Sequence, residues 1–81
     1  MYHVYILQSQ KNFDIYVGSC ENVGIRLDRH NSGKVRSTKG NKPWKILEIH
    51  NFFTRAEAVN HERFLKTGQQ KEILVRKYKK K

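Results

Sequence analysis

Two tyrosines, eleven positions apart, are the residues of this sequence best placed to do chemistry. Tyr5 and Tyr16 each lie in a short run of alternating apolar side chains, which predicts two strands of an antiparallel hairpin closing over Gln8–Phe13. The expected register pairs Val4 with Val17, Tyr5 with Tyr16 and Ile6 with Ile15. Two phenols side by side on a rigid platform could orient or deprotonate water, if nearby cations lower a pKa that is ordinarily about 10.

An arginine and a histidine follow the second strand at helical spacing. Asn22 is a suitable N-cap for a helix over Val23–Asn31, which would place Arg26 and His30 on one side. A guanidinium can bind phosphate oxygens bidentately and stabilise charge while a phosphodiester is attacked, although most helical arginines are simply solvated. Three roles stay open for His30: a bond to Tyr5, a contact with the phosphate, or an interaction with the helix dipole.

Glu62 puts a carboxylate on a helix face that should be apolar. A capping-box pattern predicts a helix over about Thr54–Thr67, on which Glu62 shares a face with Ala58 and Leu65. An unpaired buried carboxylate is costly, so a positive partner is expected there. That partner is either an arginine such as Arg26, in a structural ion pair, or a divalent cation held by one carboxylate, waters and substrate phosphate.

The remaining segments complete a small α+β domain. We expect an exposed loop over Lys34–Pro43, a buried third strand over Lys45–Phe52, a helix stop at Gly68 and a short third helix over Gln69–Tyr78. The order ββαβαα predicts a small three-stranded, largely antiparallel sheet flanked by helices. Residues 1–75 would form the single domain, and residues 76–81 a basic C-terminal tail.

Charge indicates the kind of partner. The sequence has 17 lysines and arginines against 7 acids, a net charge of +10. This charge favours binding to a polyanion such as DNA or ribosomal RNA. An acid-free stretch after the first helix is the expected nucleic-acid-binding loop, with Lys34, Arg36, Lys39 and Lys42. The lone Cys20 and the absence of a long apolar run predict a cytoplasmic protein without a membrane partner.

These residues together resemble the signature of the GIY-YIG nuclease superfamily, and in particular its small, single-domain bacterial branch. The resemblance covers about residues 2–68 and is carried by Val4-Tyr5, Tyr16-Val17-Gly18, Arg26 and Glu62; His3 stands where the first signature glycine would be. It implies a metal-dependent endonuclease that hydrolyses phosphodiester bonds in nucleic acid, with DNA as the expected substrate.

The resemblance also implies roles for single residues. Tyr5 would be the general base with Tyr16 in support, Arg26 would stabilise the phosphate and Glu62 would hold one Mg²⁺ or Mn²⁺ ion. We add His30 to this catalytic set because of its helical spacing from Arg26. The alternative is a non-catalytic module that keeps the nuclease fold and binds DNA or ribosomal RNA. A protein partner or a homodimer is left open.

Overall fold

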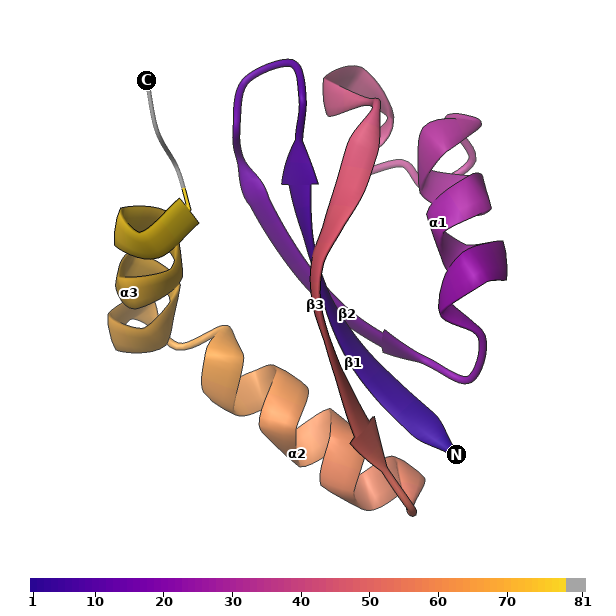
Figure 1. Cartoon of the computed structure of the whole chain (residues 1–81), viewed down its shortest axis with the longest axis vertical. Coiled ribbons are helices and arrows are strands. Elements are labelled where there is room, and N and C mark those ends of the chain that lie inside the picture. The colour runs from indigo at the N-terminus through magenta and orange to yellow at the C-terminus, as the bar shows by residue number, and fades with distance from the viewer. Residues whose placement is uncertain (79–81) are drawn as a thin grey trace.

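The computed structural model describes residues 1–78, which form one three-stranded sheet with helices on both faces (Figure 1). The elements are β1 (Tyr2–Ser9), β2 (Ile15–Cys20), α1 (Val23–Asn31), a short 3-10 turn η1 (Lys39–Asn41), β3 (Trp44–Phe52), α2 (Arg55–Leu65) and α3 (Gly68–Tyr78). The predicted α+β class and the order ββαβαα are confirmed.

Strand β1 is the centre of the sheet and pairs antiparallel with both neighbours, in the order β2-β1-β3. Strand β3 is therefore an edge strand, and most of its side chains are partly or fully exposed. The expectation of a buried third strand was wrong. The buried strand is β1, in which the side chains of Val4 to Leu7 are almost fully buried.

The hairpin register differs from the predicted one by two residues. Tyr5 pairs with Gly18 and Leu7 pairs with Tyr16, whereas we expected Tyr5 opposite Tyr16. The turn sets this register, because the Ser9 hydroxyl accepts hydrogen bonds from the backbone N–H groups of Lys11 and Asn12. A shift of two residues leaves every side chain on its predicted face, so both tyrosines still lie on the same side of the sheet.

Local capping explains where the helices begin. Asn22 accepts a hydrogen bond from the Ile25 N–H and starts α1, and Thr54 and Glu57 form the predicted capping box of α2. Helix α2 ends at Leu65, two residues short of the expected end. Gly68, predicted as the stop of this helix, instead begins α3.

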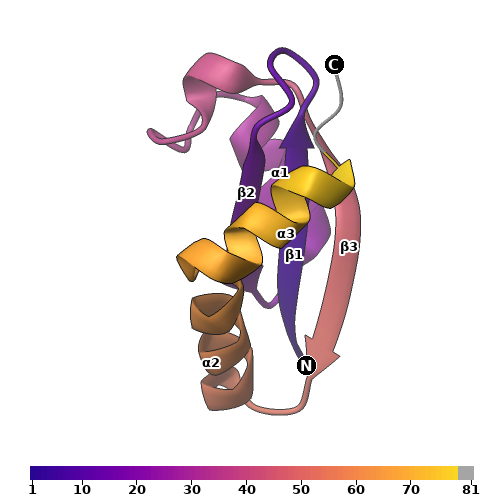
Figure 2. The same ribbon diagram turned by 90° about the vertical axis from the view of Figure 1, so that its left-hand side faces the viewer.

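The helices cover the two faces of the sheet unequally. Helices α2 and α3 pack on one face, where the core consists of aliphatic side chains such as Val4, Ile6 and Leu65. Helix α1 lies on the other face, over Tyr5, Leu7 and Trp44. Figure 2 shows α3 crossing the near face of the sheet with α1 behind it. The tyrosines therefore lie under α1, while the glutamate-bearing helix α2 lies on the opposite face.

The C-terminal helix takes up part of the expected basic tail. Arg76 and Lys77 belong to the last turn of α3, and residues 79–81 lie outside the described part of the chain. Within residues 1–78, no helix is long and apolar enough to cross a membrane.

Candidate active site

Gly18 leaves room for the Tyr5 ring beside Tyr16. A Cβ atom at this position would lie 2.5 Å from the Tyr5 hydroxyl oxygen and 3.1 Å from the Tyr16 ring. The Tyr5 phenol therefore occupies the space that a side chain at position 18 would fill. The ring centroids of Tyr5 and Tyr16 are 6.3 Å apart, so the diagonal pairing still brings the phenols together.

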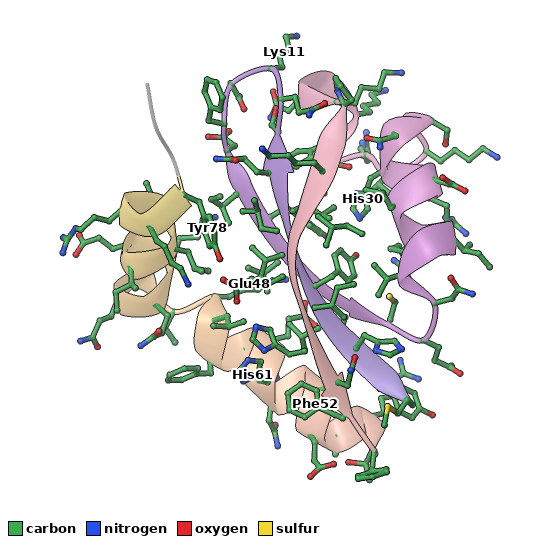
Figure 3. The ribbon with its side chains drawn as sticks, in the orientation of Figure 1. Lys11, His30, Glu48, Phe52, His61 and Tyr78 are labelled. Atoms are coloured by element: carbon green, nitrogen blue, oxygen red, sulfur yellow. The ribbon has the colours of Figure 1, made fainter. Side chains whose placement is uncertain are left out.

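His30 connects Tyr5 to the loop that follows α1. The ring is fully buried, with Nε2 3.1 Å from the Tyr5 hydroxyl and Nδ1 2.8 Å from the Thr38 hydroxyl (Figure 3). The Thr38 hydroxyl donates its own proton to the Val35 carbonyl, so it must accept the His30 bond. This assigns the proton to Nδ1 and leaves Nε2 to accept from Tyr5. Of the three roles considered for His30, the structure shows the bond to Tyr5, and its place in the last turn of α1 agrees with the interaction with the helix dipole.

Burial keeps the Tyr5–His30 pair neutral. It raises the pKa of Tyr5 well above its usual value, and Tyr16 raises it further, while the nearby charge of Arg26 only partly opposes this. Burial, followed by the charge of Arg26, lowers the pKa of the His30 imidazole. A role for Tyr5 as general base depends on a net lowering of its pKa by cations, and here the contribution of Arg26 is too small to produce one.

Glu62 reaches the edge of the sheet beside β2. Its carboxylate accepts a 2.5 Å hydrogen bond from the Ser19 hydroxyl and pairs with the Lys66 ammonium at 2.8 Å. Partial burial would raise the pKa of Glu62, but the bonds from Lys66 and Ser19 and the charges of Lys66 and Arg26 outweigh it, so the pKa lies below its usual value. The expected structural partner, Arg26, acts only at longer range, and the direct ion pair is with Lys66.

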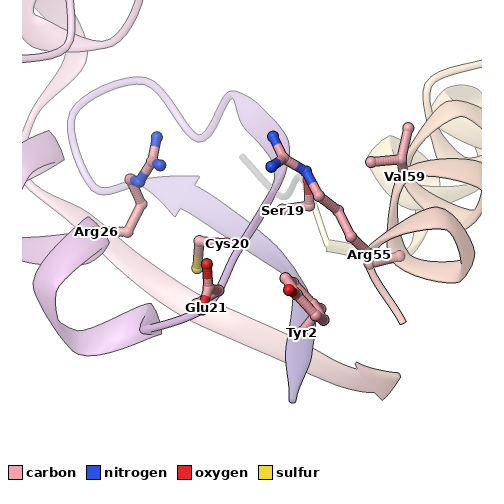
Figure 4. A pocket seen from close by; sticks show the side chains of 8 residues that line it. Tyr2, Ser19, Cys20, Glu21, Arg26, Arg55 and Val59 are labelled. Carbon is pink, nitrogen blue, oxygen red and sulfur yellow. The ribbon is translucent and has the colours of Figure 1, made fainter. Parts of the chain in front are cut away.

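Arg26 projects from α1 into a cavity of about 160 Å³ beside the end of β2. Ser19 and Cys20 form the strand side of this cavity, and Arg55 of α2 faces Arg26 across it (Figure 4). Helices from opposite faces of the sheet therefore meet around the edge of β2. Tyr5, Tyr16, His30 and Arg26 come from the α1 side, and Glu62 comes from the α2 side.

The donors at Glu62 fit a small, hard cation bound by one carboxylate. No group of three or more histidine, cysteine or acidic side chains that could hold a metal occurs within residues 1–78. Mg²⁺ needs no such cage, because it is often held by one or two carboxylates, with waters and substrate phosphates as the other ligands. The Lys66 ammonium satisfies the charge of Glu62 in this structure, and a metal ion at the carboxylate would compete with it.

The predicted nucleic-acid-binding loop is exposed but firmly anchored. Lys34, Arg36, Lys39 and Lys42 all have exposed side chains. Thr38 within the loop is buried against His30, and the Ser9 hydroxyl donates to the Asn41 carbonyl at 2.5 Å. The loop therefore lies against the β1–β2 turn, at the end of β2 opposite to the Arg26 cavity.

Sequence reasoning missed four residues that contact or border this group. Lys66 could have been found, because it lies four residues after Glu62 on the same helix. Ser19, Thr38 and Arg55 carry no such signal, since their contacts depend on how separate elements pack.

A fold of this kind, with tyrosines on a hairpin, an arginine on the next helix and a glutamate on a later one, defines a class of nuclease domains. The family described as the GIY-YIG catalytic domain matches residues 1–79. The chain belongs to the GIY-YIG nuclease family.

Relatives of two kinds share this similarity. The UPF0213 protein OB0043 of Oceanobacillus iheyensis is 32% identical over 62 residues, which cover 75% of this chain and 71% of that protein. The structure-specific endonuclease subunit SLX1 of Chaetomium globosum is 39% identical over 64 residues, covering 72% of this chain. The chain spans only 20% of the length of SLX1.

A solved structure of a small relative has the same fold. The solution NMR structure of the UPF0213 protein BH0048 from Bacillus halodurans superposes with a TM-score of 0.55 at 32% identity. The superposition covers 93% of this chain and 83% of that one.

Proposed function

We propose that this protein is a metal-dependent endonuclease that hydrolyses phosphodiester bonds in nucleic acid, with DNA as its substrate. The observation that carries the proposal is the position of Glu62, a carboxylate with a lowered pKa at the edge of β2, within the field of Arg26. Such a carboxylate stays ionised at neutral pH and can hold a cation beside a guanidinium that binds phosphate. Membership of a nuclease family supports the same assignment.

The chain's own residues divide the work between binding and orientation. Arg26 binds the equatorial oxygens of the scissile phosphate and stabilises the charge that develops there. Tyr5 donates its proton to His30, which leaves its oxygen lone pairs to accept a hydrogen bond from a water that would enter beside the half-buried Tyr16, since Tyr5 itself is almost fully buried. Tyr16, half-buried at the edge strand beside Tyr5, helps to hold that water. The exposed loop residues Lys34, Arg36, Lys39 and Lys42 bind the phosphate backbone.

Glu62 would hold one Mg²⁺ or Mn²⁺ ion, which when bound would stabilise negative charge on the leaving oxygen. Lys66 would then give up its bond to Glu62, and its charge would become available to the substrate. SLX1 is described as a subunit of a structure-specific endonuclease, and this chain spans a fifth of its length. We therefore expect a protein partner to supply recognition of DNA structure.

Cleavage by purified protein tests the proposal. Wild type and Glu62→Ala are incubated with supercoiled plasmid and with branched DNA, in Mg²⁺, Mn²⁺ or EDTA. The expected result is metal-dependent nicking by wild type only. Equal DNA binding by both proteins without any cleavage would favour the non-catalytic binding module, and nicking that persists in Glu62→Ala would show that the metal ligand is misassigned.

A further inference from the structure

Two cavities lie along the exposed edge of β2, one on each side of Glu62. The arginine cavity, of about 160 Å³, is lined by Arg26, Arg55, Ser19 and Cys20 with their neighbours. The lysine cavity, of about 340 Å³, is lined by Tyr16, Lys66, Lys71 and their neighbours. Glu62 bonds to Ser19 of the first cavity and to Lys66 of the second, and so lies between them.

The spacing of the cavities suits a nucleic-acid backbone. Tyr16 and Ser19 are three residues apart on one strand, a distance of about 10 Å at roughly 3.3 Å per residue. Phosphates on one strand of B-DNA rise about 3.4 Å along the axis per nucleotide, and the backbone path between them is longer because it winds around that axis, so fewer than three nucleotides span this distance. A backbone following β2 would pass Glu62 between the two cavities.

The charges in the cavities are available to a ligand. Within residues 1–78, Lys66 is the only one of the four cations Arg26, Arg55, Lys66 and Lys71 that forms an ion pair, and its partner is Glu62 itself. Glu21 is the one acid lining the arginine cavity, and its side chain is exposed. On the opposite edge strand, by contrast, Glu48 is bound by Lys77 and His50.

We propose that the substrate strand follows the β2 edge, with its scissile phosphate at the arginine cavity and a neighbouring phosphate at the lysine cavity, and with Arg55 and Lys71 as substrate-binding residues. The inference rests on the proposed function for its substrate class. Arg55 and Arg26 present two guanidinium forks from opposite helices, a geometry that suits the oxygens of a phosphodiester. Lys71 acts as a point charge at the other cavity, which Tyr16 and Lys66 also line. The substrate strand thus runs from the anchored basic loop, past Tyr16 and Glu62, to Arg55.

Binding measured without cleavage tests this path. A fluorescein-labelled DNA duplex is titrated in EDTA with the full chain, as wild type, Arg55→Gln, Lys71→Gln and Lys45→Gln, at several salt concentrations. Lys45→Gln is the matched control, because it removes one exposed positive charge from β3, the opposite edge of the sheet. Arg55→Gln and Lys71→Gln should each weaken binding severalfold and reduce the salt slope by about 1, with a much smaller effect of the control. Arg55→Lys, which keeps the charge, should restore the slope.

Each outcome separates this path from the nuclease assignment. Equal losses in all three glutamine variants would overturn the path, since they would report only the total charge. The path would also be overturned if the variants bound DNA as tightly as wild type. If wild type cleaved DNA in the separate nicking assay, the nuclease assignment would still stand. The expected pattern of binding in a protein that never cleaves would support the path and overturn the nuclease assignment.

Discussion

The two edges of the sheet carry nearly the same local chemistry. At the β2 edge, Glu62 is bound by the Ser19 hydroxyl and the Lys66 ammonium. At the β3 edge, Glu48 is bound by the Tyr78 hydroxyl and by Lys77. The two glutamate side chains are 20% and 24% exposed, and both pKa values lie below the usual range, that of Glu48 mainly because of the bond from Tyr78.

The two carboxylates differ in the residues that surround them. Glu48 has a third partner, His50, at 2.9 Å, and lies on the side of the sheet where His61 packs among aromatic rings (Figure 3). Glu62 instead lies between two cavities lined by positive side chains. A lowered carboxyl pKa with hydroxyl and ammonium partners therefore does not define a catalytic site. The unpaired cations nearby distinguish the candidate site from a structural ion cluster.

Exchanging each glutamate for glutamine should separate the two edges most strongly. Glu62→Gln should reduce DNA cleavage at least about 100-fold, because a bound cation and its charge stabilisation are lost, a contribution of several kcal/mol. Glu48→Gln should leave cleavage within about twofold of wild type and lower the free energy of unfolding by about 1 kcal/mol, as its charged hydrogen bonds weaken. Plasmid nicking and urea unfolding measure the two effects. Comparable losses of cleavage in both variants would abolish the distinction.

His30 and His61 should respond differently to replacement by phenylalanine. His30→Phe leaves the hydroxyls of Tyr5 and Thr38 without their partner and should cost about 2 kcal/mol. His61 Nε2 is buried without a hydrogen-bond partner within residues 1–78, so His61→Phe should be neutral or stabilise by up to about 1 kcal/mol. Urea unfolding at pH 7.5 measures both changes. A loss in His61→Phe as large as that in His30→Phe would mean that His61 has a partner.

The same variants carry a pH signature with a definite sign. Burial lowers the pKa of both histidines, and the charge of His50 lowers that of His61 further. As the pH falls, the unfolded chain therefore binds protons at these two imidazoles before the folded protein does. Stability is therefore full above about pH 6.5 and falls as the pH drops below it. His61→Phe removes one of the two contributions, so its stability should fall less than that of wild type between pH 7.5 and 5.5.

The lysines at the two edges should show the smallest contrast. Lys66→Met removes an ammonium that competes for Glu62 and should tighten Mn²⁺ binding by about threefold, since a partly exposed ion pair contributes only about 0.2–1 kcal/mol. Lys77→Met, at Glu48, should leave Mn²⁺ affinity unchanged. Isothermal titration without DNA measures the binding. Weaker Mn²⁺ binding in Lys66→Met would show that the lysine supports the ion and does not compete with it.

Sequence reasoning succeeded where the causes are local. The limits of α1 follow from Asn22 and the start of α2 from Thr54, because each cap satisfies backbone N–H groups a few residues away. The faces of Tyr5 and Tyr16 follow from strand alternation alone, which a register shift of two residues does not disturb.

It failed where distant segments decide the outcome. The hairpin register depends on the Ser9 turn and on the fit of Tyr5 over Gly18, and neither is encoded in apolar alternation. The edge position of β3 depends on which strand takes the centre of the sheet. The direct partners of Glu62 depend on the docking of α2 beside Ser19, so sequence reasoning considered an arginine or a divalent cation and missed the lysine and the serine that bind it.

The central position of β1 sets an order of events during synthesis. The β1–β2 hairpin and α1 contain only neighbouring residues, so they can assemble while the ribosome is still adding the rest of the chain. Strand β3 pairs with β1 across separations from 35 residues (Ser9 to Trp44) to 50 residues (Tyr2 to Phe52). One long edge of β1 therefore stays unpaired until that later strand emerges, which is the stage at which a nascent sheet is most exposed to pairing with other chains. Glu62 lies beyond β3 in the chain, so the group of catalytic candidates is completed only after all three strands have been synthesised.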